Sequence, residues 1–494
     1  MSLKQQTFSS VRWTTFVAVC RAGLQILQVA ILARLLAPED FGLMAIVAAI
    51  LSFLTIFADM GISSAIIHHQ NITQQQLSSL YWLNVLTGFV MMALLSAMSP
   101  FIGSFYNDSR LTSLIMLASS NFFMSALSQQ LRVKAEKELK FASLARIELV
   151  GVLVGFVAAI VMAYKGLGVF SLVGASVIST LLTSLLSWVI LANGWYPQFR
   201  FRLGEVSEFL NFGAYIVGNN IANNINMMAD IFLGGRLLGA ADLGLYSLPR
   251  NLCLQVQSLI NPIVTRVGFP VMSRIQNDPV QLKAIYLKTM RMTASINFPF
   301  YIGMAVFAPE IVAILFGEKW IGSVDILRIL AIWGLLRSTG NPVGSLLLAV
   351  GKAKLSFKWN VTLVLIVPCI LWWGSHFGVI GMALGLVGLQ AALLIPAWYF
   401  LVRPCCKAGI FEYLKQLLVP FWISLVAVAL GYFVVDDTKY LLSRFLISFH
   451  LSTVISLAIG LGVAAVLYIG ISFFYNREWT NSMSQLLGRK ILVS

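Results

Sequence analysis

The residues best suited to chemistry in this sequence are amides and arginines that interrupt long apolar runs. One run carries a polar side chain at almost every third or fourth position: Asn211, Tyr215, Asn219, Asn223, Asn226 and Asp230. At 3.6 residues per turn these positions share one face of a helix. Amides both donate and accept hydrogen bonds, so this stripe could bind a hydroxyl-rich ligand such as a sugar. The alternative is that the amides join neighbouring helices.

Arginines form the second set of candidates. Arg21 lies in an apolar run with Gln25 and Gln28 on the same helix face. Two later runs are also interrupted, one by Arg250 and Arg266 and the other by Arg337. An arginine at the centre of a membrane span costs about 2.5–3.5 kcal/mol, so it normally faces a cavity or a partner. A guanidinium binds phosphate through two parallel hydrogen bonds. The four arginines therefore predict a phosphate site, with the alternatives that Arg266 reaches the lipid head groups and that Arg250 lies at the membrane surface.

Two carboxylates and one helix break complete the candidates. Asp59 and Asp230 lie in apolar runs, where each either pairs with an arginine or binds a proton or sodium ion that drives a transport cycle. The segment 337–342 (RSTGNP) contains both glycine and proline and is expected to interrupt its helix. Interrupted helices often form the ligand sites of transporters.

The elements that must position these residues are membrane helices. Apolar residues make up 59% of the 494 positions and charged residues only 11%, whereas soluble domains have about 25% charged residues. A span needs about 20 apolar residues, and on that basis the sequence predicts an all-α integral membrane protein with about fourteen spans. They run over 11–36, 41–67, 77–103, 110–133, 143–164, 167–193, 207–233, 243–272, 284–308, 322–350, 357–376, 378–401, 414–435 and 447–475.

The distribution of lysine and arginine among the connections predicts the orientation. Alternate connections carry seventeen of these residues on one side and seven on the other, which places both termini in the cytoplasm. The same bias explains the net charge of +15 without nucleic-acid binding. The first apolar run is too long for a signal peptide, so we expect the N-terminus to be retained. The five cysteines have no metal-ligand spacing, and we expect no metal and no cofactor.

An internal repeat predicts the domain organisation. The stretch 34–43 (RLLAPEDFGL) recurs at 236–245 (RLLGAADLGL), an offset of 202 residues. The repeat predicts two six-helix lobes, 1–203 and 204–403, followed by an additional helix pair within 404–494. Six spans separate the copies, so they lie on the same side of the membrane and the repeats are parallel. Transporters built from such repeats bind their substrate between the halves.

Several segments resemble a known family. They are 33–42 (ARLLAPEDFG), 80–84 (LYWLN), 260–270 (INPIVTRVGFP), 296–299 (INFP), 316–320 (FGEKW), 335–345 (LLRSTGNPVGS) and 356–360 (SFKWN). These segments are similar to the polysaccharide transporter family of the multidrug/oligosaccharidyl-lipid/polysaccharide exporter superfamily, and to its colanic acid and teichuronic acid exporters in particular. The resemblance covers about the first 400 residues.

The resemblance implies a monomeric flippase of the bacterial inner membrane that works by alternating access. Its substrate would be an oligosaccharide repeat unit linked to undecaprenyl diphosphate, delivered to a polysaccharide polymerase. The diphosphate would bind at Arg21, Arg250, Arg266 and Arg337, of which only Arg266 and Arg337 lie within matching motifs. The sugars would lie along Gln25, Gln28, Asn219, Asn223 and Asn226. Membrane lipids are the other expected partner.

Two other transporters of the same superfamily remain as alternatives. A cation-coupled multidrug extruder would line its cavity with carboxylates, whereas arginines outnumber carboxylates in the apolar runs here. A peptidoglycan-precursor (lipid II) flippase shares a cationic cavity, but the motifs favour the polysaccharide exporters. An enzyme would be expected to carry a large loop or a soluble catalytic domain, and no connection between the predicted spans exceeds about 20 residues.

Overall fold

The computed structural model describes the backbone of residues 20–59, 62–63, 66, 72–199, 201–444 and 449–486. Side chains are described for the same residues except 59, 203–217, 219, 262–267, 443–444, 449–450 and 482–486. Within these ranges helices follow one another through short turns and no strand occurs, which confirms the all-α class. The contacts divide the chain into two compact units, 1–244 and 245–494. The repeat boundary at 203/204 concerns the duplication in sequence and stays a prediction.

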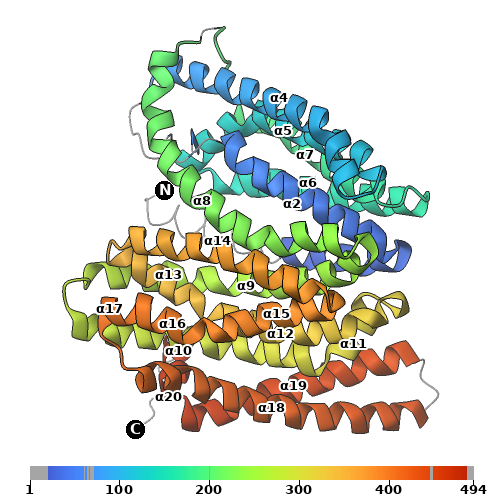
Figure 1. Cartoon of the computed structure of the whole chain (residues 1–494), viewed down its shortest axis with the longest axis vertical. Coiled ribbons are helices and arrows are strands. Elements are labelled where there is room, and N and C mark those ends of the chain that lie inside the picture. Colours follow the sequence, from blue (N-terminus) through green and yellow to red (C-terminus); the bar gives the residue numbers. More distant parts are fainter. Residues whose placement is uncertain are drawn as a thin grey trace. The chain divides into compact units, whose positions relative to one another are not determined.

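The first unit is a helical bundle. It contains the helical residues 20–35 and then α2 (Pro38–Asp59), α4 (Gln74–Phe105), α5 (Arg110–Lys137), α6 (Phe141–Tyr164), α7 (Phe170–Leu191) and α8 (Leu203–Leu237). Figure 1 shows α4, α5 and α7 running side by side, and α4 packs on α5, α5 on α7 and α7 on α6. Helix α8 packs along α2. Each helix matches a span expected from the sequence.

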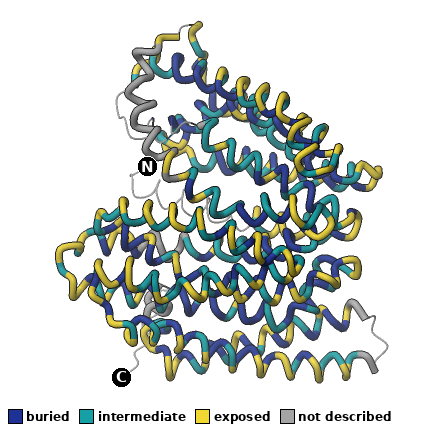
Figure 2. Tube along the Cα trace, viewed as in Figure 1, coloured by how far each residue is buried: buried dark blue, intermediate teal, exposed yellow. Residues whose placement is uncertain are grey.

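Helix α4 exposes many of its large apolar side chains, and its buried residues are mostly small or polar, although Leu80, Tyr81, Leu83 and Leu95 are buried as well. Phe89, Leu94 and Phe101 are exposed, whereas Asn84 and Ser99 are buried. Figure 2 shows the exposed residues recurring along α4. A soluble protein would have the reverse pattern. In a bilayer the lipid surrounds the apolar face, and helices pack through small and polar residues. Burial therefore supports membrane insertion independently of hydropathy.

The second unit is a larger helical bundle with several broken helices. Helix α9 (Ala240–Arg274) begins in the first unit, and the chain continues through α10 (Pro279–Val306), α11 (Ala308–Leu315), the 3₁₀ turn η1 (Glu318–Ser323), α12 (Val324–Ser338), α13 (Gly340–Ala349), α14 (Ala353–Ser375), α15 (Gly378–Ala392), α16 (Leu394–Ala397), the π-helical segment η2 (Trp398–Val402), α17 (Arg403–Cys406), α18 (Ile410–Arg444), α19 (Phe449–Tyr475) and α20 (Arg477–Leu486). The break between α12 and α13 at Thr339 confirms the interruption expected within 337–342.

The additional helix pair packs into the second unit against α10. Helices α18 and α19 lie against each other, and α18 packs along α10. The Tyr468 hydroxyl donates to the Ser295 carbonyl at 2.7 Å, and the Asn476 amide nitrogen donates to the Ser295 hydroxyl at 2.8 Å. The Arg291 Nε donates to the Asn476 side chain at 2.7 Å. These buried polar contacts join the pair to α10.

Nine of the described helices are long and apolar enough to cross a bilayer. The number becomes ten if α10 and α11, which meet at 79°, form one broken span. The chain is therefore a multi-pass membrane protein, while the total of fourteen spans stays a prediction. Two described segments were not expected from the sequence: α11 with η1, which follow the bend, and the short helix α20.

Candidate functional site

The amide stripe on α8 divides into buried and exposed positions. Asn223 is exposed, Asn226 is half-buried and Asp230 is buried with 4% exposure. Asn224, on the flank of the stripe, donates from Nδ2 to the Ser52 hydroxyl of α2 at 3.0 Å. The alternative role of the amides as interhelical contacts thus applies to Asn224. The side chain of Asn219 lies outside the described residues.

The stripe in helix 20–35 is accessible at its first two positions. Arg21 and Gln25 are exposed, and Gln28 is half-buried. Steps of four and three residues place all three side chains on one face of the helix, as the sequence predicted. Both polar stripes of the first unit therefore retain side chains that a ligand can reach.

Arg337 lies at the end of α12, directly before the helix break. Its guanidinium is half-buried, and its Cζ lies 5.1 Å from the centre of the Trp333 ring one turn earlier. The ring holds the cation in place through its negative face. The negative end of the α12 dipole also favours a cation at this position. Arg337 is therefore held in a defined orientation within the second unit.

The remaining predicted residues are distributed over both units. Arg250 is buried in α9, with 4% exposure, and its depth in the membrane stays a prediction. The side chains of Arg266 and Asp59 lie outside the described residues. Asp230 is the buried end of the α8 stripe, and its Oδ1 accepts the Ile231 N–H at 3.0 Å. Whether the four arginines line one cavity stays a prediction.

The first copy of the repeated motif begins helix α2. Pro38 occupies the first helical position, where its missing N–H costs nothing. The Ala37 N–H donates to the Asp40 carboxylate at 3.0 Å, which is half of a capping box. The second copy begins α9 with Asp242 in the same relative position. The motif therefore specifies where each of these helices starts.

Glycines let the two copies of the motif pack against each other. A Cβ atom added at Gly42 would lie 1.8 Å from the Ala240 carbonyl oxygen, and one added at Gly244 would lie 1.8 Å from the Pro38 carbonyl oxygen. Gly42 and Gly244 are equivalent in the repeat, as are Pro38 and Ala240. The contact is thus reciprocal, and each glycine permits a backbone approach that no other residue allows.

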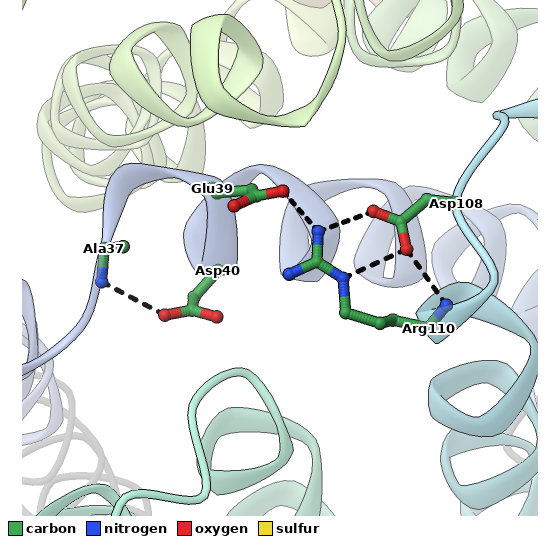
Figure 3. A network of polar contacts seen from close by, with 5 residues as sticks. All are labelled: Ala37, Glu39, Asp40, Asp108 and Arg110. Carbon is green, nitrogen blue, oxygen red and sulfur yellow. Dashed lines mark hydrogen bonds and ion pairs between the residues drawn. The ribbon is translucent and has the colours of Figure 1, made fainter.

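An ion-pair network joins the start of α2 to the turn between α4 and α5 (Figure 3). The Arg110 guanidinium contacts Glu39 and lies 2.7 Å from Asp108 Oδ2. The Arg110 N–H also donates to Asp108 at 2.9 Å. Hydrogen bonding from Arg110 lowers the pKa of the Asp108 carboxyl below its usual value. The network fixes the start of α2 through charged groups from two parts of the chain.

The lowered pKa of Asp108 predicts a small loss of stability in acid. The carboxylate stabilises the fold above its unfolded pKa of about 3.9, and this contribution is lost as the pH falls through the lower folded value. We expect Asp108→Asn to lower the thermal unfolding midpoint slightly at neutral pH, by less than about 1 kcal/mol of stability because the network is partly exposed. The difference from the wild type should shrink below about pH 4.

The matched control for this measurement is Asp325→Asn. Asp325 pairs with Arg328 across one helical turn, and its side chain is 66% exposed, so its replacement should have less effect at any pH. A midpoint difference between Asp108→Asn and wild type that persists unchanged in acid would contradict the assigned role of Asp108.

The structure also brings together polar residues that the sequence did not single out as a site. They line a cavity of about 420 Å³ within the first unit and include Asn84, Asn121 and Gln129. From the sequence, Asn84 was noted only as part of the segment 80–84, which resembles the family. The signal that could have identified Asn84 and Asn121 is the one applied to α8, namely amides inside apolar runs. Among the described residues no group of three or more histidine, cysteine or acidic side chains could hold a metal ion.

Comparison with known proteins identifies relatives of this chain. Residues 31–325 match the family described as "Polysaccharide biosynthesis protein". The chain is 33% identical over 434 residues to the lipopolysaccharide biosynthesis protein WzxC of Escherichia coli (strain K12), with 87% of this chain and 88% of that protein covered. It is 29% identical over 494 residues to the teichuronic acid biosynthesis protein TuaB of Bacillus subtilis (strain 168), with 98% of each covered.

Solved structures support the fold. The structure described as lipid II flippase MurJ in an inward closed conformation superimposes with a TM-score of 0.73 at 14% sequence identity. The match covers 95% of this chain and 99% of that one. At this level of identity the likeness concerns the arrangement of helices alone. The helices of this chain therefore follow the fold of a known membrane transporter.

Proposed function

Because the chain belongs to the polysaccharide biosynthesis protein family, we propose that it is a flippase that carries a lipid-linked oligosaccharide across the bacterial inner membrane for the assembly of a surface polysaccharide. The observation that carries this proposal is the match to relatives named for lipopolysaccharide and teichuronic acid biosynthesis over most of their length. The expected substrate is a repeat unit on undecaprenyl diphosphate. Its product would pass to a polysaccharide polymerase.

The chemistry of the candidate residues fits such a substrate. A diphosphate needs cationic donors, which Arg21, Arg250, Arg266 and Arg337 would supply. The sugars need neutral donors and acceptors, which Gln25 and Asn223 would supply from exposed positions. The prenyl chain requires no protein site because it is soluble in the bilayer. One polar surface for the head group and a path along the lipid would therefore suffice for translocation.

In the proposed cycle the head group binds from the cytoplasmic side, where it is assembled, and is released on the opposite side after the two lobes rock against each other. Alternating access of this kind is general among transporters built from repeats. We place both termini in the cytoplasm on the basis of the charge bias between connections. We propose a monomer as the working unit, because one chain contains both repeats.

Proton or sodium coupling through Asp59 or Asp230 is the proposed energy source. Asp230 is suited to the role because it is buried in a helix that carries accessible amides. Binding a proton or cation would neutralise the carboxylate and change the cost of burying it. No bound cofactor is needed for such a cycle.

The alternatives within the superfamily have less support. A lipid II flippase shares the fold, but a structural match at 14% identity does not choose a substrate. A multidrug extruder for organic cations would be opposed by the arginines in α9 and α12, since like charges repel in a medium of low dielectric. The relatives named for polysaccharide biosynthesis favour the oligosaccharide.

Deletion of the gene in its native host tests the function. We expect the surface polysaccharide to be lost and a lipid-linked oligosaccharide to accumulate in the cytoplasmic leaflet, because synthesis continues while translocation stops. Extraction of the lipid-linked glycans and mass spectrometry would identify the repeat unit, and re-expression of the intact chain should reverse both effects. Unchanged surface polysaccharide, with no accumulated intermediate, would refute the proposal.

A further inference from the structure

The cavity of the first unit carries no charge, and hydroxyl and amide groups are set within a lining that is mostly apolar by area. Its lining comes from α2, α4, α5 and α7, and eight of its fifteen lining residues carry a hydroxyl or amide group while none is ionisable. Thr55 and Ser125 are exposed, so the cavity can be reached from outside the unit. Its volume of about 420 Å³ falls within the range of roughly 300–1,000 Å³ typical of small-molecule sites. At roughly 30 Å³ per molecule, a few ordered waters would not fill it.

Two amide oxygens that border the cavity lack hydrogen-bond partners. Asn84 is 4% exposed, and its Nδ2 donates to Gln130 Oε1 at 3.2 Å, while its Oδ1 has no partner. The Asn121 Nδ2 donates to the Ala118 carbonyl at 3.0 Å, while its Oδ1 likewise has no partner. A buried acceptor without a partner costs about 1–3 kcal/mol. These two lining residues therefore keep unused hydrogen-bonding capacity at the edge of the cavity.

The hydroxyl groups of the lining also face the cavity as acceptors. Thr55 donates to the Leu51 carbonyl at 2.7 Å, Ser176 to the Val173 carbonyl at 2.7 Å and Thr180 to the Ser176 carbonyl at 2.9 Å. Each hydroxyl hydrogen is thereby used within its own helix, which leaves the oxygen as an acceptor. The Ser176 oxygen already accepts from Asn121 Nδ2 at 3.4 Å. The hydroxyl oxygens therefore add hydrogen-bond acceptors to a lining that is mostly apolar by area.

We propose that this cavity binds a sugar residue of the carried oligosaccharide. A sugar ring combines hydroxyl groups with apolar C–H faces in a neutral body, and this combination matches an uncharged site of this volume whose lining mixes hydroxyl and amide groups with apolar side chains. The cavity adjoins the amide stripe, because Ser52 of its lining accepts the hydrogen bond from Asn224 of α8. The inference rests on the proposed function and adds to it a location for part of the glycan.

A cation is the competing occupant, because it too binds neutral oxygens. The lining offers it no carboxylate, and the cavity is far larger than the space inside a cage of six to eight oxygen ligands at about 2.3–2.6 Å. A sugar is therefore the better match. The labelling experiment compares sodium chloride with potassium chloride to test the cation separately.

The first experiment measures export by the variant Asn84→Leu/Asn121→Leu in the deletion strain. Removing two hydrogen-bonding amides from the lining, at about 1 kcal/mol each, should reduce export by about tenfold or more, with the protein present in the membrane at normal level. The control is Asn297→Leu in α10, a fully buried asparagine that also has an unpartnered Oδ1 but does not line the cavity. We expect this control to export normally.

The second experiment probes the cavity directly and does not depend on those variants. Ser125→Cys, placed in the full chain after replacement of the five native cysteines, is labelled with a water-soluble maleimide. Galactose and N-acetylglucosamine should slow the labelling, while sodium chloride in place of potassium chloride should not. The control is Ser113→Cys, which is exposed on the same helix and outside the lining, and whose labelling should be unaffected.

The outcomes separate this inference from the proposed function. Protection at position 125 by sodium but not by sugars would replace the sugar with a cation. Normal export by the double leucine variant, or labelling that neither sugar alters, would overturn the inference. If Arg337→Ala then still abolished export, the flippase function would stand without this cavity. Failure of the deletion strain to accumulate a lipid-linked oligosaccharide would instead overturn the function.

Discussion

Replacing Arg337 with alanine is expected to abolish polysaccharide export while the protein remains in the membrane. The residue is half-buried and its guanidinium is held above Trp333, so the side chain is already ordered before a ligand binds. Hydrogen bonds to charged groups contribute about 1.5–3 kcal/mol, which corresponds to roughly 10–150-fold in affinity. Arg337→Lys should restore export only in part, because an ammonium cannot engage the diphosphate with two parallel bonds. Export in the deletion strain is the measurement.

The control for Arg337 lies on the same helix. Arg328 is exposed and pairs with Asp325 at 3.1 Å, so Arg328→Ala removes a cation without removing the proposed ligand contact. We expect export close to wild type. The same loss predicted for Arg337→Ala is predicted for Arg21→Ala in the first unit. Normal export in both variants would remove the arginines from the proposed site.

Replacing Gly42 or Gly244 with alanine is expected to lower the stability of the protein, and by more than Asp108→Asn does. The new Cβ would lie 1.8 Å from a backbone oxygen, Ala240 for Gly42→Ala and Pro38 for Gly244→Ala. A backbone atom cannot rotate away as a side chain can, so the start of α2 or of α9 must shift. Overpacking costs about 1–3 kcal/mol and sometimes more. The unfolding midpoint of the detergent-solubilised protein and its level in the membrane would measure the effect.

Gly388→Ala is the control for the glycine variants. A Cβ at this position in α15 would meet no atom within 4 Å, and alanine is favoured over glycine within a helix by about 0.5–1 kcal/mol. The midpoint should therefore stay the same or rise. Gly42→Ala and Gly244→Ala variants that unfold at the same temperature as Gly388→Ala would show that the reciprocal packing is dispensable.

Much of the fold could be predicted from the sequence, because lipid as a solvent imposes a simple rule. Each span must be apolar and long, and the described helices fall at the expected positions. The break at Thr339 was predictable from Gly340 and Pro342. The segment α11 with η1 was not, since it is short and its packing depends on contacts such as those of the buried Trp320. Helix α20 is likewise set by its neighbours, with Trp479 packed edge-on against Tyr468.

The candidate site was predictable in its residue types but not in its spatial grouping. Periodicity placed Asn223, Asn226 and Asp230 on one face, yet it could not tell that the neighbouring Asn224 would bond to Ser52. Asn84 and Asn121 were visible as amides in apolar runs. That they border one cavity depends on how α4 and α5 pack, which includes the close approach at Gly88. Contacts between elements far apart in sequence follow from packing rather than from local pattern.

Four of the described helices, α4, α8, α9 and α18, are considerably longer than a bilayer is thick. Helix α4 has 32 residues and α18 has 35, which correspond to about 48 Å and 52 Å at 1.5 Å per residue. The hydrocarbon layer measures about 30 Å, so these helices must tilt or extend into the head-group region. A rocking motion that alters their tilt changes how well they match the surrounding lipid. In the proposed transport cycle, the thickness of the host membrane would thereby contribute to the free-energy difference between the two end states.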